Sequence, residues 1–334
     1  MEQRELGKSG LRIAPLVFGG NVFGGNVFGW TADERTSLDL LDRFVDAGLN
    51  AIDTADVYSV WVDGHQGGES ETIIGRWMQA RGARNRVVLA TKVGMDMGGG
   101  RTGLKAAWIE EEVEASLRRL QTDHIDLYFA HQDDLDTPLE ETLEAFARLV
   151  QAGKVRAIGA SNYEAPRLAE ALELSAKNGW PRYEVLQPHY NLYDRVAYEV
   201  ALEEVASEAG LGVVTYFSLA RGFLTGKYRS EADLSKSVRG QALAGNFEER
   251  GLRVLAALDE VAAETGGTPA QVALAWLMAR PSVTAPIASA TSLAQLDELI
   301  GAVHLRLAPD ALERLDQASM PKLLEESEKI IANE

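Results

Sequence analysis

Short apolar runs alternate along the chain with longer stretches in which apolar residues recur every three or four positions. The short runs predict buried parallel strands, and the longer stretches predict amphipathic helices that cover them. We expect strands in segments 12–20, 51–56, 87–94, 125–132, 155–162, 183–191, 212–219 and 284–290. We expect helices in segments 32–48, 69–82, 106–121, 138–153, 165–179, 195–210, 249–266, 269–280, 293–303 and 310–319.

This repeat favours an α/β fold, a single (β/α)8 TIM barrel over residues 1–334 with a short N-terminal hairpin and a C-terminal helical tail. A doubly wound sheet is the alternative, but it would carry a G-x-G-x-x-G fingerprint after its first strand. The glycines of FGGNVFGG at 18–25 do not have that spacing. The connection from Ala220 to Asn246 is long for a simple loop, so we expect it to serve function.

Composition and charge remove several classes of function. None of the 334 residues is cysteine, which excludes disulfides, thiolate metal sites and a cysteine nucleophile. A formal net charge of −17 argues against nucleic acid or an anionic membrane as a partner. The five histidines lack a metal-binding spacing such as H-E-x-x-H, so we expect no metal. The polar N-terminal segment and the lack of a long apolar run predict a cytoplasmic protein, and its state as monomer or homo-oligomer stays open.

Polar residues gather where the predicted strands end. In a barrel these carboxyl ends share one mouth, which is where the chemistry of the fold takes place. The residues at or just after the strand ends are Asp53, Tyr58, Lys92, His131, Ser161, Asn162, Gln187, Tyr216, Ser289 and Thr291. Lys92 lies within an apolar run, where an unpaired ammonium would be costly, so we expect the Asp53 carboxylate beside it.

Four of these residues would together form a proton-donating site. A lysine cation close to the phenol of Tyr58 favours the phenolate, so we expect Lys92 to lower the tyrosine pKa from about 10. Asp53 would hold the lysine in place, and His131 would hydrogen-bond the substrate oxygen. Such a site protonates an oxygen on which negative charge develops, as carbonyl reduction requires. A glycosidase is an alternative, but it would need paired carboxylates at the mouth.

Several longer stretches resemble the aldo-keto reductase superfamily. They are NAIDTADVYS (50–59), LATKVG (89–94), DHIDLYFAHQDD (123–134), GKVRAIGASNY (153–163), LQPHYNL (186–192) and YFSLARGFLTGKY (216–228). They follow the order and spacing of that superfamily over nearly the whole chain. The stretch GGESETIIGRWM (67–78) is similar to the branch of bacterial oxidoreductases and potassium-channel β-subunits.

The resemblance implies an NADP(H)-dependent oxidoreductase that reversibly reduces an aldehyde or ketone to an alcohol. In that reading Tyr58 is the general acid, Lys92 and Asp53 tune it, and His131 orients the carbonyl group. A small carbonyl or alcohol compound would be the substrate. The alternative that the resemblance leaves open is a cofactor-binding regulatory subunit with little turnover, like the potassium-channel β-subunits.

The resemblance also implies a binding site for the cofactor. Ser161, Asn162 and Gln187 would hold the carboxamide, and Tyr216 would stack on the nicotinamide ring. The other residues implied to contact the cofactor are Asp53, Phe217, Ser218, Leu219, Arg221, Lys227, Arg239, Ser289, Thr291, Gln295 and Glu298. Many NADP-preferring members carry a lysine and an arginine where this chain has Ser289 and Gln295, so NAD is an alternative cofactor.

The phrase GGNVF occurs twice in succession, at 19–23 and 24–28. It follows the first strand, so we expect Gly20 and Asn21 to contact the cofactor at the mouth. We expect the substrate to meet a group of aromatic side chains, namely Phe23, Phe28, Trp30 and Trp61. A neutral duplication without functional effect is the alternative, because surface loops accept extra residues at small entropic cost.

Overall fold

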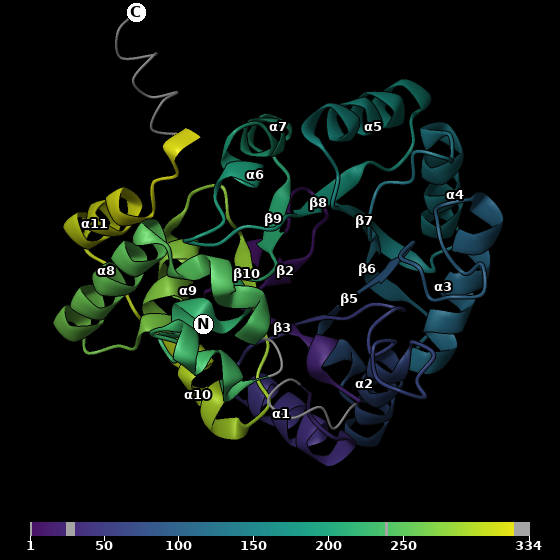
Figure 1. Cartoon of the computed structure of the whole chain (residues 1–334). Helices are drawn as coiled ribbons and strands as arrows, with labels where there is room; N and C mark the ends of the chain where they lie inside the picture. Colours follow the sequence, from purple (N-terminus) through teal and green to yellow (C-terminus); the bar gives the residue numbers. More distant parts are fainter. Residues whose placement is uncertain (1, 25–30, 238–239, 324–334) are drawn as a thin grey trace, which may run out of the picture.

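The computed structural model describes residues 2–24, 31–237 and 240–323. Its parallel strands close into a barrel in the order β10-β3-β4-β5-β6-β7-β8-β9, and helices surround it (Figure 1). The strands are β3 (Val17–Gly19), β4 (Ala51–Asp53), β5 (Val88–Val93), β6 (Ile125–Ala130), β7 (Val155–Ser161), β8 (Tyr183–Gln187), β9 (Gly212–Thr215) and β10 (Ala285–Ala288). This arrangement confirms the predicted (β/α)8 barrel.

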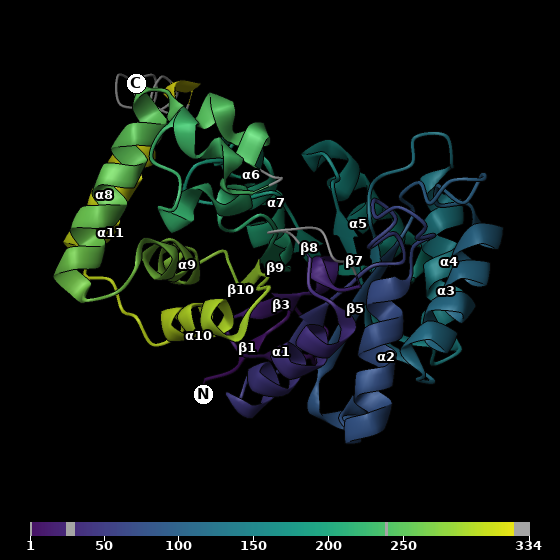
Figure 2. The same cartoon turned by 60° about the horizontal axis from the view of Figure 1, so that its bottom comes forward.

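Helices follow the strands in alternation and form the outer layer (Figure 2). They are α1 (Glu34–Asp46), α2 (Glu69–Arg81), α3 (Ala106–Leu120), α4 (Leu139–Gln151), α5 (Ala165–Asn178), α6 (Val196–Glu199), α7 (Leu202–Ala209), α8 (Glu249–Thr265), α9 (Pro269–Ala279), α10 (Leu293–Ala302) and α11 (Pro309–Ser319). The helix expected at 195–210 is divided, because Ala201 leaves the helical region with φ −146° and ψ −35°. None of the helices in the described ranges combines the length and apolar character needed to cross a membrane.

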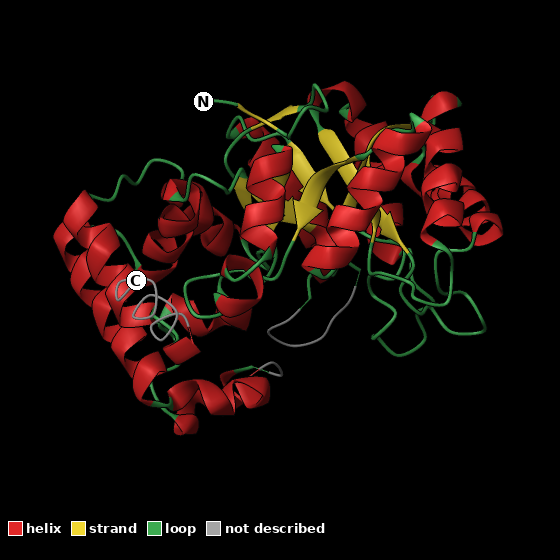
Figure 3. Cartoon of the chain, turned by 90° about the horizontal axis from the view of Figure 1, so that it is seen from above, coloured by secondary structure: helices red, strands yellow, loops and turns green. Residues whose placement is uncertain are grey.

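A hairpin of β1 (Arg4–Glu5) and β2 (Arg12–Ile13) precedes the barrel. Its buried side chains Leu6, Leu11 and Ile13 pack against the residues that fill the barrel interior. Figure 3 shows the N-terminus at one end of the molecule and most long loops at the opposite end. The hairpin, which the sequence predicts, therefore covers the amino-terminal end of the barrel.

Close backbone packing fixes this hairpin in place. Gly7 has φ +57°, and a Cβ there would lie 2.3 Å from the carbonyl oxygen of Glu184. Any side chain at this position would push the hairpin off β8. The guanidinium of Arg4 donates to the carbonyl oxygens of Met278 and Thr284, each at 3.0 Å. The first strand is thus attached to a segment close to the other end of the chain.

The barrel interior is filled by side chains from alternate strand positions. Ala90, Leu127 and Phe129 face inward, whereas Leu89 and Tyr128 pack under the helices. A Cβ on Gly159 would lie 2.4 Å from the ring of Phe129, so the glycine makes room for that ring. The lower part of the barrel is a packed core, and space for a ligand remains at the carboxyl ends of the strands.

Candidate active site

Alternation along the strands places polar side chains at the barrel mouth. Asp53 and Lys92 follow the inward-facing Ala51 and Ala90 by two positions, and side chains two apart on a strand share a face. On the other strands, the same even spacing from an inward-facing residue holds for Ser161, Gln187, Tyr216 and Ser289. The polar layer therefore lies directly on the apolar core.

The four predicted catalytic residues come together in this layer. The Nζ of Lys92 lies 2.7 Å from Asp53 Oδ2 and donates to the phenolic oxygen of Tyr58 at 3.0 Å. It also donates to the carbonyl oxygen of Thr54 at 2.8 Å, so all three of its protons have acceptors. The ring of His131 packs edge-on against the ring of Tyr58, with centroids 5.9 Å apart.

Burial sets the protonation states of this group. It raises the pKa of Tyr58 well above its ordinary value, and the neighbouring Asp53 carboxylate adds to the increase. Burial lowers the pKa of Lys92, against the opposing effect of Asp53. Burial and the Lys92 charge hold the pKa of His131 well below its ordinary value. The expected lowering of the tyrosine pKa is therefore wrong, because burial and the neighbouring Asp53 carboxylate both disfavour the phenolate.

Hydrogen bonds join the rest of the mouth to the same group. Asp53 Oδ1 accepts from Gln187 Nε2 at 2.9 Å, and Ser161 Oγ donates to the Gln187 carbonyl at 2.9 Å. Asn162 accepts a hydrogen bond from the Tyr216 hydroxyl at 2.7 Å. Asn162 is also left-handed, with φ +55°, a conformation that costs free energy and is often found at functional sites.

A cavity of about 870 Å³ opens above these residues. The predicted site residues that line it are Asn21, Asp53, Tyr58, Trp61, His131, Ser161, Asn162, Gln187, Tyr216, Phe217, Ser218, Leu219, Arg221, Lys227, Ser289, Thr291, Gln295 and Glu298. Sequence reasoning did not single out several other lining residues, among them Val57, Gln132, Thr225 and Ser237. A volume of this size suits a ligand larger than a simple aldehyde.

A family model for the aldo/keto reductase family matches residues 15–320. The chain belongs to the aldo/keto reductase family. It is 36% identical over 324 residues, 95% of each chain, to an uncharacterized oxidoreductase, YrpG, of Bacillus subtilis. It is 32% identical over 331 residues to a probable voltage-gated potassium channel subunit beta of Arabidopsis thaliana, with 96% of this chain and 98% of the relative covered. It is 29% identical over 353 residues to a versiconal hemiacetal acetate reductase of Aspergillus parasiticus, with 98% and 100% covered.

Two expectations for the first GGNVF phrase of this aldo/keto reductase are wrong. Phe23 is fully buried and stacks on Phe18, with centroids 5.4 Å apart, so it cannot meet a substrate. A Cβ on Gly20 would lie 2.9 Å from Ser70 Oγ of α2, and Gly20 does not line the cavity. Asn21 does line the cavity and accepts a hydrogen bond from Ser289 at 2.7 Å. The expected contacts of Phe28, Trp30 and Arg239 lie outside the described residues.

The loop after β9 carries the basic residues of the cavity. The Arg221 guanidinium lies over the Phe217 ring at 4.5 Å, and Lys227 Nζ lies 4.9 Å from the ring centroid of Tyr228. Neither forms an ion pair with a carboxylate of the described ranges, whereas Arg229 in the same loop is paired with a carboxylate of α8 at 2.6 Å. These two cations are therefore available for an anionic ligand.

The segment after β10 lines the same end of the cavity with uncharged groups and one carboxylate. Gln295 Oε1 accepts from the backbone N–H of Thr291 at 2.9 Å and from its hydroxyl at 3.1 Å. Ser292 caps α10, whose N-terminus is close to these residues. Glu298 also lines the cavity. Positions 289–299 hold no lysine or arginine, so this segment supplies no cation to the cavity.

A buried polar network beneath the catalytic group was not predicted. Glu71 of α2 accepts from Thr91 Oγ1 and from Arg119 Nε, each at 2.6 Å, and Arg119 also pairs with Glu112. Asp56, two residues before the candidate acid, is fully buried, and burial and neighbouring carboxylates raise its pKa well above the ordinary value. The sequence signal for this network was Glu71, an acidic residue on the apolar face of the helix expected at 69–82. The network ties α2 and α3 to the residues that flank the catalytic pair.

Proposed function

We propose that this chain is an NADP(H)-dependent oxidoreductase that reversibly reduces an aldehyde or ketone to an alcohol, with Tyr58 as the proton donor. The observation that carries the proposal is the hydrogen bond from Lys92 to the phenolic oxygen at 3.0 Å, on the wall of the cavity. The phenol's own proton is directed to Asp53 Oδ2 at a long 3.4 Å, so a substrate oxygen in the cavity could replace that weak acceptor. Family membership supports the coarser statement that the chain is an oxidoreductase that uses a nicotinamide cofactor.

The protonation states suit such a donor. The raised pKa of Tyr58 keeps the phenol protonated at neutral pH, and the lowered pKa of His131 keeps the imidazole neutral. Tyr58 would give its proton to the carbonyl oxygen as that atom gains negative charge. The ammonium of Lys92 would then stabilise the phenolate that remains, and the neutral imidazole of His131 would hydrogen-bond the substrate oxygen.

The residues around the cavity fit a dinucleotide. The two cations of the β9 loop that form no ion pair within the described ranges offer the local positive charge that an acidic chain needs to bind a pyrophosphate. Hydroxyl and amide groups at the strand ends would hold the carboxamide, and those residues are Ser161, Asn162 and Gln187. When bound, the reduced nicotinamide supplies the hydride that is added to the carbonyl carbon.

The choice of NADP over NAD rests on the family likeness. Without a basic residue at 289–299, a 2′-phosphate would depend on hydroxyl and amide groups such as Thr291 and Gln295 and on the N-terminus of α10. Such contacts lack charge assistance and bind a phosphate less strongly. NAD therefore remains the alternative cofactor.

A second candidate is a cofactor-binding regulatory subunit with little turnover. The Arabidopsis relative named as a probable channel subunit favours it, at 32% identity over almost the whole chain. In that function the cavity would bind the dinucleotide, and the catalytic group would contribute little.

The test compares native protein with Tyr58→Phe for oxidation of NADPH by 4-nitrobenzaldehyde and for the dissociation constants of NADPH and NADH. We expect kcat to fall about 10²–10⁴-fold while both dissociation constants stay unchanged, because the variant loses only the transferable proton. Tyr163→Phe is the matched control, since the Tyr163 hydroxyl is also hydrogen-bonded but the residue is buried away from the cavity. Tight binding of NADPH by the native chain without turnover would favour the regulatory subunit.

A further inference from the structure

The ring of Tyr216 lies between the cavity and the imidazole of His189. Tyr216 lines the cavity, and His189 does not. The two rings are almost parallel, at 18°, with centroids 5.2 Å apart. The imidazole therefore covers the face of Tyr216 that is turned away from the cavity. A ligand ring that stacks on Tyr216 would use the face that is left open.

A carboxylate sits beside the imidazole. Asp194 Oδ2 lies 3.1 Å from His189 Nε2 and accepts a hydrogen bond from Asn191 Nδ2 at 2.9 Å. Asn191 in turn accepts from the Asp194 backbone N–H at 2.8 Å and donates to the Phe217 carbonyl at 3.0 Å. The amide group of Asn191 thus joins the loop after β8 to the residue that follows Tyr216. The neighbouring imidazole and amide groups lower the pKa of Asp194, against the opposing effect of burial.

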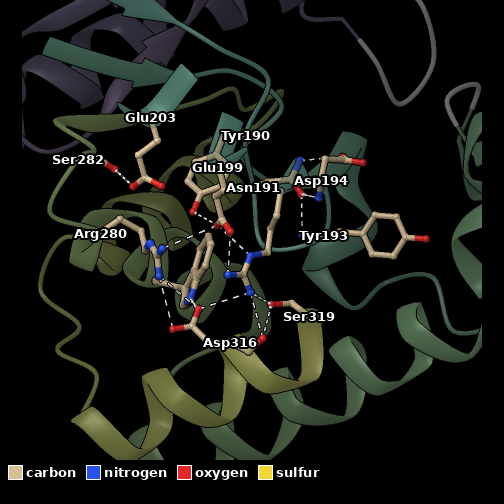
Figure 4. A network of polar contacts seen from close by, with 12 residues as sticks. Tyr190, Asn191, Tyr193, Asp194, Glu199, Glu203, Arg280, Ser282, Asp316 and Ser319 are labelled. Atoms are coloured by element: carbon tan, nitrogen blue, oxygen red, sulfur yellow. Dashed lines mark hydrogen bonds and ion pairs between the residues drawn. The ribbon is translucent and has the colours of Figure 1, made fainter. Parts of the chain in front are cut away.

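The loop that carries this pair is attached firmly to the helical layer. Figure 4 shows Asn191 and Asp194 facing each other, beside a network that reaches α11. In that network Glu199 accepts from Tyr190 at 2.6 Å, and Arg195 donates to Glu199 at 2.8 Å and to Ser319 Oγ at 2.9 Å. Both ends of the segment from Tyr190 to Arg195 are therefore held by hydrogen bonds of buried side chains. A rigid segment can hold an imidazole at a constant distance behind a neighbouring ring.

We propose that His189, held by Asp194, is a positioning residue that fixes the ring of Tyr216 for stacking on the nicotinamide of the cofactor. The inference rests on the proposed function, because it needs a nicotinamide at the open face of Tyr216. His189 acts through Tyr216 and touches neither cofactor nor substrate. Without the imidazole, the tyrosine ring could turn into the vacated space, and the hydrogen bond to Asn162 and the edge contact with Phe217 would remain to hold it among the described residues.

The experiment measures the dissociation constant of NADPH by fluorescence titration for native protein, His189→Ala, His189→Phe and Asp194→Asn. We expect His189→Ala to bind NADPH about three- to tenfold more weakly, the loss associated with one aromatic stacking contact. His189→Phe restores a flat ring behind Tyr216 and should return the constant to within about twofold of native. Asp194→Asn should fall between them, since it keeps the hydrogen-bonding shape and loses the charge. The KM of the aldehyde should stay unchanged in all three variants.

The matched control is His124→Ala. His124 also lies beside a carboxylate, with Nδ1 2.7 Å from Asp123 Oδ1, but it is outside the cavity. Native affinity in His189→Ala, or a His189→Phe variant as weak as His189→Ala, would overturn the proposal. A native chain that binds neither NADPH nor NADH would overturn the proposed function and this inference together. The melting temperature of each variant shows whether weaker binding comes from loss of the fold.

Discussion

Two regions of the candidate active site differ in how their cations are held. Below Tyr58, the ammonium of Lys92 is fully buried and has an acceptor for every proton, within 3.0 Å. In the loop after β9, Arg221 and Lys227 line the cavity, lie over aromatic rings and form no ion pair among the described residues. The first cation is part of the fold, and the other two are left for a ligand. The fully hydrogen-bonded ammonium of Lys92 lies where a proton would be transferred. The two loop cations lie where an anionic ligand would bind.

Removal of the buried cation should have the largest effect on stability. Lys92→Met leaves the carboxylate of Asp53 buried without its partner, so we expect the free energy of unfolding to fall by about 3–5 kcal/mol. Urea denaturation followed by circular dichroism measures the loss. Adding Asp53→Asn to Lys92→Met should recover much of it, because the uncompensated charge is then gone. A single variant as stable as native protein would show that the ion pair is not part of the fold.

Removal of a loop cation should weaken binding and spare stability. For Lys227→Met we expect the dissociation constant of NADPH to rise about tenfold, the loss of one charge-assisted contact, with the melting temperature unchanged. Arg229→Met is the control in the same loop, because Arg229 is paired with Asp259 and does not line the cavity. Equal NADPH affinity in the two variants would remove the distinction between the paired and unpaired cations.

The smallest effect concerns Asp56, the buried acid near the catalytic group. Its folded-state pKa is raised, so it costs stability above the unfolded pKa of about 4, and the cost grows as pH rises toward the folded pKa. Asp56→Asn has the same shape and can still accept from the Val57 N–H. We expect the melting temperature to rise by about 2–4 °C at pH 7 and to match native protein near pH 4. A decrease at pH 7 would mean that Asp56 is charged in the fold.

The periodic features of the molecule could be predicted from the sequence. Eight apolar runs separated by amphipathic stretches lead to a barrel, and parity then brings Asp53 and Lys92 to its mouth. The N-terminal hairpin was also predicted correctly. These features depend on spacing along the chain, which a sequence records directly.

The direction of a side chain within a turn and the depth of its burial could not be predicted in the same way. Phe23 is buried and lies four residues after the inward-facing Gly19. The segment between them is a turn, which has no regular repeat from which the direction of a side chain could be predicted. The pKa of Tyr58 depends on how much protein surrounds the phenol. The sequence predicts a neighbouring lysine but does not show how deeply the phenol is buried. Arg119 meets Glu71 across two helices, so their pairing required the packing of α2 on α3.

The hairpin at the base of the barrel affects the order in which segments of the chain can fold during synthesis. Arg4 is bonded to Val283 and Thr284, 279 and 280 positions further along the chain. At about 5–20 residues per second, a ribosome makes the receiving carbonyl groups roughly 15–55 s after the arginine. Until then Leu6, Leu11 and Ile13 have no complete barrel to enter. These hairpin residues are thus made long before the segment that holds them and are among the last to reach their place, and a slow, late closure exposes them to chaperones or to aggregation.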